Sequence, residues 1–233
     1  MTTSSRDDSI LCQAHRCSTV IQQELSEIPL ASFADHAHLI YRLDFSNNLL
    51  RSLPTDFFDH FPSSRFLNLS HNQLETLPLG IGRCAALQFL DLSFNGISSL
   101  PDDFADVMKS VQYLYLSGNP LFRLPGFILS SGVLQQLYAD QTGLEDLPDA
   151  CPQHSELTVL SLADNAICRL PPSLANLTQL EILDLTGVRW MEPTDSKTSV
   201  TLSAFSTFVN ANPLLQRVDK KVCNSDCCCL YYV

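Results

Sequence analysis

The sequence predicts an α/β solenoid, in which each repeat adds one short strand to a parallel sheet and one short outer turn. Three observations predict it. The pattern L-x-L-x-x-N-x-L-x-x-L-P returns every 23 or 24 residues. Its L-x-L core alternates apolar and polar positions, as a half-buried strand does. An apolar residue also stands three positions after each proline. We expect a curved, horseshoe-shaped solenoid with the parallel sheet lining its inner face.

Six copies of the pattern are legible and a seventh decays. The most regular copy ends at Pro101 and carries Leu90, Leu92 and Asn95 in register. A threonine, Thr142, replaces the asparagine in one copy. The seventh copy starts at Leu183 and loses the pattern before reaching a proline. The strand cores of the six legible copies begin at Leu43, Leu67, Leu90, Leu114, Leu137 and Leu160.

Asparagine recurs at the sixth position of five copies. Its amide both donates and accepts hydrogen bonds, so it can satisfy backbone groups freed where the chain leaves each strand. Loss of one such buried pairing typically costs about 1–3 kcal/mol. We therefore expect a structural ladder that consists of Asn48, Asn72, Asn95, Asn119 and Asn165.

The segment after each Leu-Pro pair is expected to cross the outside of the solenoid. Proline ends the strand and fixes one backbone torsion. The apolar residue three positions later predicts that the segment packs inward as a short helical or 3-10 turn. These six anchors are Phe57, Ile81, Phe104, Ile128, Cys151 and Leu174.

The ends of the chain differ from its middle. Residues 1–17 are polar and lack periodicity, which predicts a disordered N-terminal segment. Residues 18–222 are expected to form one repeat domain with N- and C-terminal caps, closed by a strand through Leu215 and Val218. Residues 223–233 form a cysteine-rich tail.

The charge balance limits the classes of partner. The 25 acidic and 14 basic residues give a formal net charge of −11. No stripe of Lys and Arg is present, which argues against nucleic-acid binding, and a basic protein partner is electrostatically easier to accept. The N-terminus lacks the basic flank and apolar run of a signal peptide, and no stretch has the length of a transmembrane helix. We expect a cytoplasmic protein.

The repeats resemble the cytosolic leucine-rich repeats of the Ras-group and scaffold type, over about residues 18–222. The resemblance implies a protein-binding scaffold or regulatory adaptor with no chemistry of its own and no cofactor. It does not carry over a partner, because one fold serves many functions. The alternative is a secreted or cell-surface recognition module with terminal disulfides. Cys12 and Cys17, followed by LSEIP, resemble the N-terminal cap of such proteins.

A partner site is expected on the inner face of the sheet. Residues that flank the buried leucines of each strand must point away from the core, and aromatic residues gather there in the middle repeats. Exposed aromatic groups are typical of interaction hot spots. The alternative is that the rings only pack against each other and stiffen the sheet. The predicted partner-binding residues are Phe66, Phe89, Asp91, Phe94, Tyr113, Tyr115, Tyr138 and Asp140.

Motifs for catalysis or metal binding are weak. The stretch from Gly80 to Ala85 fits a G-x-G-x-x-A string but lies on an expected outer turn rather than between a strand and a long helix. The six histidines have no nucleophile at a predictable spacing, and the Cys12–Cys17 segment matches no zinc framework. We expect neither an enzyme nor a metal site.

The tail carries three consecutive cysteines next to the apolar residues of its last four positions. Cys227, Cys228 and Cys229 are candidate S-acylation sites, which would give lipid-mediated membrane association without a transmembrane segment. The alternative is a plain tail with reactive thiols.

Overall fold

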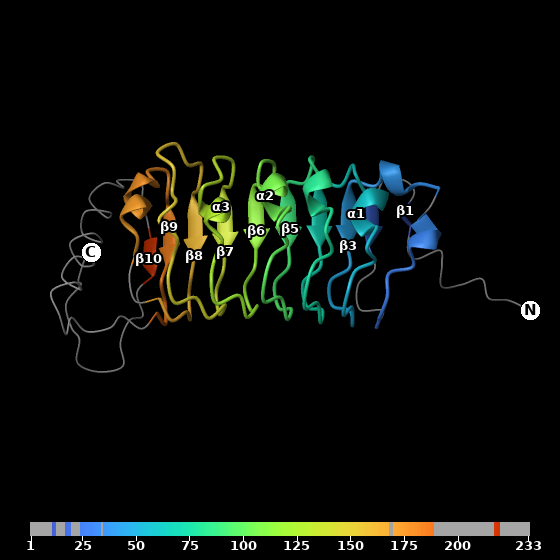
Figure 1. Cartoon of the computed structure of the whole chain (residues 1–233), viewed down its shortest axis with the longest axis horizontal. Coiled ribbons are helices and arrows are strands. Elements are labelled where there is room, and N and C mark those ends of the chain that lie inside the picture. Colours follow the sequence, from blue (N-terminus) through green and yellow to red (C-terminus); the bar gives the residue numbers. More distant parts are fainter. Residues whose placement is uncertain are drawn as a thin grey trace, which may run out of the picture. The chain divides into compact units, whose positions relative to one another are not determined.

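The structure is a computed structural model that describes residues 11–12, 17–19, 24–33, 35–167, 170–188 and 217–219. The chain divides into two compact units, Met1–Pro120 (unit 1) and Leu121–Val233 (unit 2). In each unit, short strands alternate along the chain with short outer turns, as Figure 1 shows. The predicted α/β repeat solenoid is thereby confirmed.

Unit 1 contributes six of the described strands. The first two pair antiparallel, and every later pair in the unit is parallel. The register aligns the central leucines of the regular strands, so that Leu67 pairs with Leu43 and Leu90. These leucines are at most 1% exposed. The strands are β1 (Leu11–Cys12), β2 (Cys17–Thr19), β3 (Arg42–Asp44), β4 (Phe66–Asn68), β5 (Phe89–Asp91) and β6 (Tyr113–Tyr115).

Unit 2 repeats this arrangement with four described strands, all parallel to their neighbours. The decayed seventh copy still supplies β9, because Leu183 and Leu185 keep the apolar alternation. A strand is present where Val218 was expected to close the domain, and Val218 pairs with Leu183, while Leu215 lies outside the described residues. The strands are β7 (Gln136–Tyr138), β8 (Val159–Ser161), β9 (Ile182–Asp184) and β10 (Arg217–Asp219).

Short helical turns lie after five of the six Leu-Pro pairs. Each contains its predicted apolar anchor, and all five anchors are at most 1% exposed. Two further 3-10 turns, η2 (Leu30–Phe33) and η3 (Ala37–Leu39), precede the first regular repeat. The five turns are α1 (Phe57–His60), η4 (Ile81–Arg83), α2 (Phe104–Val107), α3 (Gly126–Leu129) and η5 (Pro172–Asn176).

The sixth anchor, Cys151, is buried but stands in no helical turn, so the prediction was wrong for this segment. Pro152 follows it directly, and a residue before proline is pushed from helical to extended backbone angles. The segment is fixed instead by the next repeat. The Cys151 N–H donates to Ser173 Oγ at 3.1 Å, and its carbonyl accepts from Asn176 Nδ2 at 2.9 Å.

The core of the first repeats contains a cluster of phenylalanines in addition to the leucines. Phe33, Phe45 and Phe61 are at most 1% exposed, and Phe33 meets the other two edge-on, with centroid distances of 6.1 and 5.5 Å. Phe57 joins them from α1 at 6.2 Å from Phe45. Edge-to-face pairs add to the hydrophobic effect of burial, so these rings tie the outer turns to the sheet where the regular repeats begin.

Candidate functional site

The strand-side face of unit 1 is built from the residues that flank each buried central leucine. Side chains alternate across a strand, so these flanking residues point away from the core. On β4, β5 and β6 four of them are aromatic, and all four are partly exposed. We call this set the aromatic face. It consists of Phe66, Phe89, Tyr113 and Tyr115.

The rings of the aromatic face contact each other across neighbouring strands. Phe66 and Phe89 stack with centroids 4.2 Å apart and an interplanar angle of 8°. Phe89 meets Tyr115 at 5.2 Å and Tyr113 at 6.5 Å, both tilted. On the other side, the Arg42 guanidinium carbon lies 3.6 Å from the Phe66 centroid. The rings therefore do pack together, as the stiffening alternative expects, while each keeps part of its surface in solvent.

Phe94 lies outside the aromatic face, in a left-handed turn. Its φ is 54°, and its side chain is 47% exposed. The ring stacks on His71 with centroids 4.5 Å apart and an interplanar angle of 13°. Positive φ is uncommon for a bulky residue. The sequence placed Phe94 on the sheet face, whereas the structure places it on the turn that leaves β5.

The left-handed angle recurs at the residue before the asparagine position in every described repeat. The residue types at this position are a sequence signal for the left-handed angle. Several residues in the column are glycine, asparagine or aspartate, which adopt this angle most easily. The column consists of Asn47, His71, Phe94, Gly118, Gln141, Asp164 and Gly187.

Asp91 lies beside the aromatic face, at the end of β5. Its Oδ1 accepts from Ser93 N at 2.9 Å, and no ion pair to it occurs among the described residues. Burial raises the pKa of the Asp91 carboxyl, while the Ser93 hydrogen bonds and the nearby His71 act in the opposite direction. A half-buried carboxylate without a cation is a candidate binding group.

Tyr138 and Asp140, the remaining predicted site residues, belong to unit 2. Tyr138 is partly exposed on β7. Asp140 Oδ1 accepts from Ser161 Oγ at 2.5 Å and from Ala163 N at 2.8 Å, so this carboxylate binds the following repeat.

A second exposed aromatic residue of unit 2, Phe122, was not among the predicted site residues. It is 58% exposed at a φ of 56°, and its ring packs against Gly143.

The five asparagines link successive repeats through the backbone. Each Oδ1 accepts a backbone N–H of the preceding repeat, and each Nδ2 donates to the carbonyl three residues earlier. For Asn119 the partners are Ile97 N at 3.0 Å and Leu116 O at 2.8 Å. Thr142 keeps one of these bonds, from its hydroxyl to Ala139 O at 2.9 Å. These contacts give the asparagines a role in the fold.

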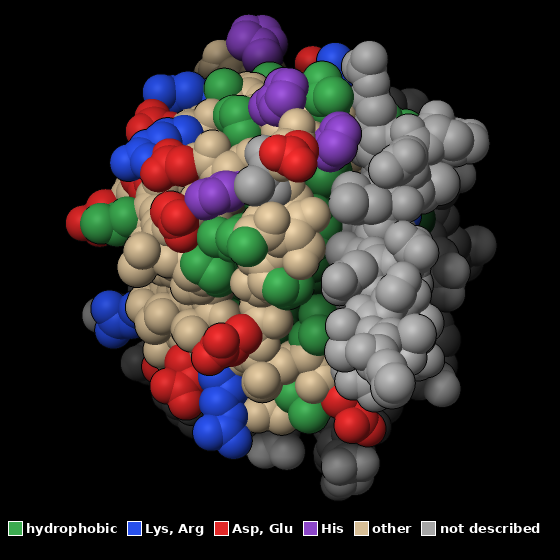
Figure 2. Space-filling model, turned by 90° about the vertical axis from the view of Figure 1, so that its right-hand side faces the viewer, with side chains coloured by type: hydrophobic (Ala, Val, Ile, Leu, Met, Phe, Trp, Pro, Cys, Tyr) green, Lys and Arg blue, Asp and Glu red, His purple; other side chains and the backbone are tan. Residues whose placement is uncertain are grey.

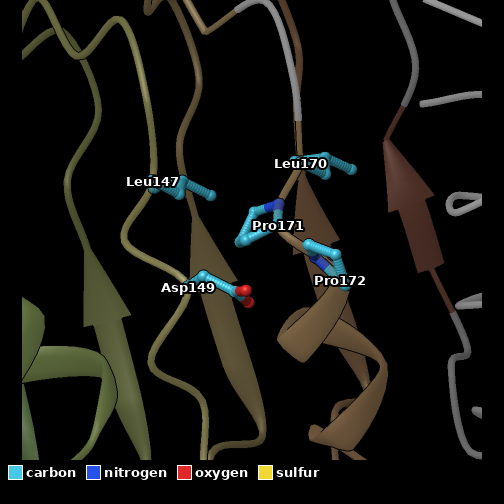
Figure 3. A pocket seen from close by; sticks show the side chains of 5 residues that line it. All are labelled: Leu147, Asp149, Leu170, Pro171 and Pro172. Carbon is cyan, nitrogen blue, oxygen red and sulfur yellow. The ribbon is translucent and has the colours of Figure 1, made fainter. Parts of the chain in front are cut away.

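Two pockets, one in each unit, have no catalytic arrangement in their linings. In unit 2, a pocket of about 280 Å³ lies between consecutive Leu-Pro segments, where Asp149 faces Pro171 and Pro172 (Figure 3). Asp149 is its one charged residue, and Oδ1 already accepts from Ser173 N at 2.8 Å. The pocket of about 380 Å³ in unit 1 has a mixed lining that consists of Ser26, Glu27, Leu49, Arg51, Ser52 and Gln73.

Charged groups on the described surface are mixed in sign. Figure 2 shows the side of the molecule at the right of Figure 1, where acidic and basic side chains alternate along the margin. In the described part of the chain, no group of three His, Cys, Asp or Glu side chains is placed to hold a metal ion.

None of the described helices has the length and hydrophobicity to cross a bilayer. Cys227, Cys228 and Cys229 lie outside the described residues.

Comparisons with known proteins agree with this architecture. Two family models, both described as leucine-rich repeat, match residues 22–74 and 86–107. The chain is a leucine-rich repeat protein. Its fold is similar to that of a leucine-rich repeat protein of Leptospira interrogans, with a TM-score of 0.60 and 23% identity over 84% of this chain. The search of curated protein sequences gave no match.

Other leucine-rich repeat structures show the same fold. The leucine-rich repeat domain of the type III effector XopL gives a TM-score of 0.63 at 21% identity, over 91% of this chain and 78% of that one. A chain of the Drosophila Toll–Spätzle complex gives 0.57 at 23% identity, over 75% of this chain and 26% of that one. The present chain spans 57% of the Leptospira protein. Leucine-rich repeats are commonly protein-interaction modules without catalytic activity.

Proposed function

We propose that this leucine-rich repeat protein is a non-catalytic scaffold or regulatory adaptor that binds a basic protein partner on the strand-side face of unit 1. The observation that carries the proposal is the aromatic face, in which four partly exposed rings lie on three adjacent strands, and three of them, Phe66, Phe89 and Tyr113, are in register. Aromatic residues dominate the energetics of protein interfaces because they bury a large area at a small entropic cost.

The ring contacts within the face support binding rather than oppose it. Stacking of Phe66 on Phe89 fixes both side chains before a partner arrives. A preorganised surface loses less conformational entropy on association. The net charge of −11 and the half-buried Asp91 favour a partner with basic residues. One of the structural neighbours is a chain of a complex, that of Toll with Spätzle.

The test pairs affinity capture with a purified binding assay. A protein captured from lysate is purified and titrated against the wild type, the Tyr113→Ala/Tyr115→Ala variant and a Leu79→Ala control. Leu79 is 68% exposed on an outer segment, so its loss removes apolar surface elsewhere. We expect the double variant to bind at least about 30-fold more weakly, as for a hot-spot loss of about 2 kcal/mol, and the control to bind normally.

The measurement also shows how the proposal fails. Equal affinity of the double variant and the wild type would overturn it, and a loss confined to Leu79→Ala would move the interface to the outer turns. Melting curves decide whether a loss reflects binding, because removal of Tyr115 also removes its contact with Phe89. A variant that melts like the wild type and does not bind supports the aromatic face.

The cellular compartment is part of the proposal. Cys84 and Cys151, the cysteines whose surroundings are described, are both free thiols, which fits an intracellular protein. One observation favours the secreted alternative. The β1–β2 register places Cys12 opposite Cys17, and the Cα separation of such antiparallel pairs falls within the range that disulfides span. Nine reactive thiols in the denatured protein support the intracellular proposal, and seven or fewer support export.

A further inference from the structure

The aromatic face already holds one cation that belongs to the chain itself. The Arg42 guanidinium lies 3.6 Å from the centroid of Phe66, and its Nη2 is 4.0 Å from Asp44 Oδ2. A positive group between an aromatic face and a carboxylate gains both cation–π attraction and Coulomb energy. This arrangement shows how the strand-side surface of unit 1 accommodates a guanidinium.

The same elements recur around Asp91 without a cation. Asp91 occupies the repeat position of Asp44, two strands further along the sheet. Phe89 stands two residues earlier on the same side of β5, and Tyr115 is the register partner of Asp91 on β6. The residues that pair with β5 from β4 and β6 include no lysine or arginine. His71 and Asp44 are the other ionisable groups that act on the Asp91 carboxyl.

The carboxylate of Asp91 is thus half-buried beside aromatic rings, and it forms no ion pair with any lysine or arginine among the described residues. Burial of an unpaired charge is unfavourable, so a carboxylate in this position gains most from a cation supplied from outside. Arginine and lysine both combine a charged head with an apolar stem that can cover aromatic surface. A guanidinium adds planar stacking on rings and a two-pronged contact with carboxylate.

We infer that an arginine or lysine side chain of the protein partner occupies the position over Asp91, beside the contacting rings of Phe89 and Tyr115. The inference rests on the proposed function, whose partner it specifies by one anchoring side chain. The cation stacks on the partly exposed rings and pairs with the carboxylate, as Arg42 does with Phe66 and Asp44. Arginine is the better occupant because its planar head can contact a ring and pair with the carboxylate in a two-pronged geometry.

The probe is an acetylated and amidated hexa-arginine peptide, titrated into the full chain by calorimetry at physiological salt. Asp91→Asn removes the charge and keeps the local hydrogen bond. Asn68 demonstrates this at the same repeat position, because its Oδ1 accepts from Ser70 N at 3.0 Å. The matched control is Asp184→Asn in unit 2. It removes one charge from the same repeat position, where Oδ1 accepts from Thr186 N at 2.8 Å.

We expect Asp91→Asn to weaken hexa-arginine binding by roughly tenfold, the loss typical of one charge-assisted contact, and Asp184→Asn to change it by less than about twofold. Equal losses in both variants would show that only overall charge matters and would overturn the inference. An unchanged affinity in Asp91→Asn would overturn it as well. Hexalysine in place of hexa-arginine tests the choice of cation, and we expect it to bind more weakly to the wild type.

The hexa-arginine titration and the partner-binding assay can fail independently of each other. If Tyr113→Ala/Tyr115→Ala abolishes capture of the partner while Asp91→Asn leaves hexa-arginine binding intact, the aromatic face stands and the cation position is wrong. If Asp91→Asn weakens hexa-arginine binding while the tyrosine variant captures the partner normally, the cation position exists and the proposed partner face is wrong.

Discussion

The ring of Phe94 packs directly against the backbone of Gly118. A Cβ atom added to Gly118 would lie 2.6 Å from Phe94 Cδ1, closer than side chains tolerate. On its other side the ring stacks on His71 at 4.5 Å. Gly118 also has a φ of 70°, an angle at which glycine is less strained than alanine. The glycine therefore provides both the space and the backbone angle that the exposed Phe94 ring requires.

Gly118→Ala is expected to destabilise the protein. The new methyl group must displace the Phe94 ring, and alanine must adopt a left-handed backbone angle. We expect a loss of about 1–3 kcal/mol in the free energy of unfolding, measured by urea denaturation. The control is Gly132→Ala, where an added Cβ has no neighbour within 4 Å, and it should leave stability unchanged or slightly raised. Equal stability of the two variants would contradict this account of the Phe94 position.

The positions of the strands and of most outer turns could be predicted because both follow from apolar spacing. The central leucines and the anchors after each proline must be buried, and burial fixes which residues face inward. The left-handed angle of Phe94 could not be predicted from its own residue type, since phenylalanine disfavours it. It follows from the turn geometry that all repeats share. The lack of a helical turn at Cys151 could have been predicted from Pro152.

The partner face was harder to predict than the fold. Sequence periodicity placed Phe66 and Phe89 on one surface, and the register confirms that they are neighbours. It did not indicate that the rings stack, or that Arg42 covers Phe66, because such contacts depend on side-chain torsions. The sequence predicted both Asp140 and Asp91 as partner-binding residues, at different positions of the repeat. The structure separates them, because Asp140 binds the next repeat and Asp91 bonds only within its own turn.

Asn119→Ala is expected to unfold at lower denaturant concentration than the wild type. The side chain is 1% exposed, and its amide bonds to Ile97 N, Leu92 O and Leu116 O. Alanine leaves these backbone groups buried without partners, which costs about 1–3 kcal/mol. Ser98→Ala, at an exposed position in the preceding repeat, is the control and should shift stability by less than about 0.5 kcal/mol. Similar unfolding midpoints for both variants would show that the ladder contributes little.

The two buried thiols should resist alkylation in the native protein. Burial raises the pKa of Cys84 and of Cys151 from 9.0 to about 11. Because the thiolate is the reactive form, its fraction near pH 8 falls roughly 100-fold below that of a free thiol. Mass spectrometry after iodoacetamide treatment should show both residues unmodified in the native protein and fully modified after denaturation. Labelling of the native thiols as fast as in denaturant would show that the outer turns open freely.

Asp91→Asn should stabilise the protein at neutral pH although it weakens cation binding. Burial raises the pKa of Asp91, so the folded state disfavours the ionised form. The stability cost is therefore absent below the pKa of the unfolded chain, near 3.9. It develops as the pH rises through the folded value and is complete at pH 7. The gain in melting temperature from Asp91→Asn should follow that course, and it should vanish near pH 3.

Asp149→Asn provides the control of opposite sign. Hydrogen bonds from Ser173 lower the pKa of Asp149, so the fold favours its ionised form, and that stability is lost as the pH falls through the folded value. The exposed position makes the effect small. Asp149→Asn should slightly lower the melting temperature at pH 7 and not at pH 3. If both variants shifted the melting temperature in the same direction at pH 7, net charge rather than local burial would govern stability, and the unpaired state of Asp91 would lose its energetic basis.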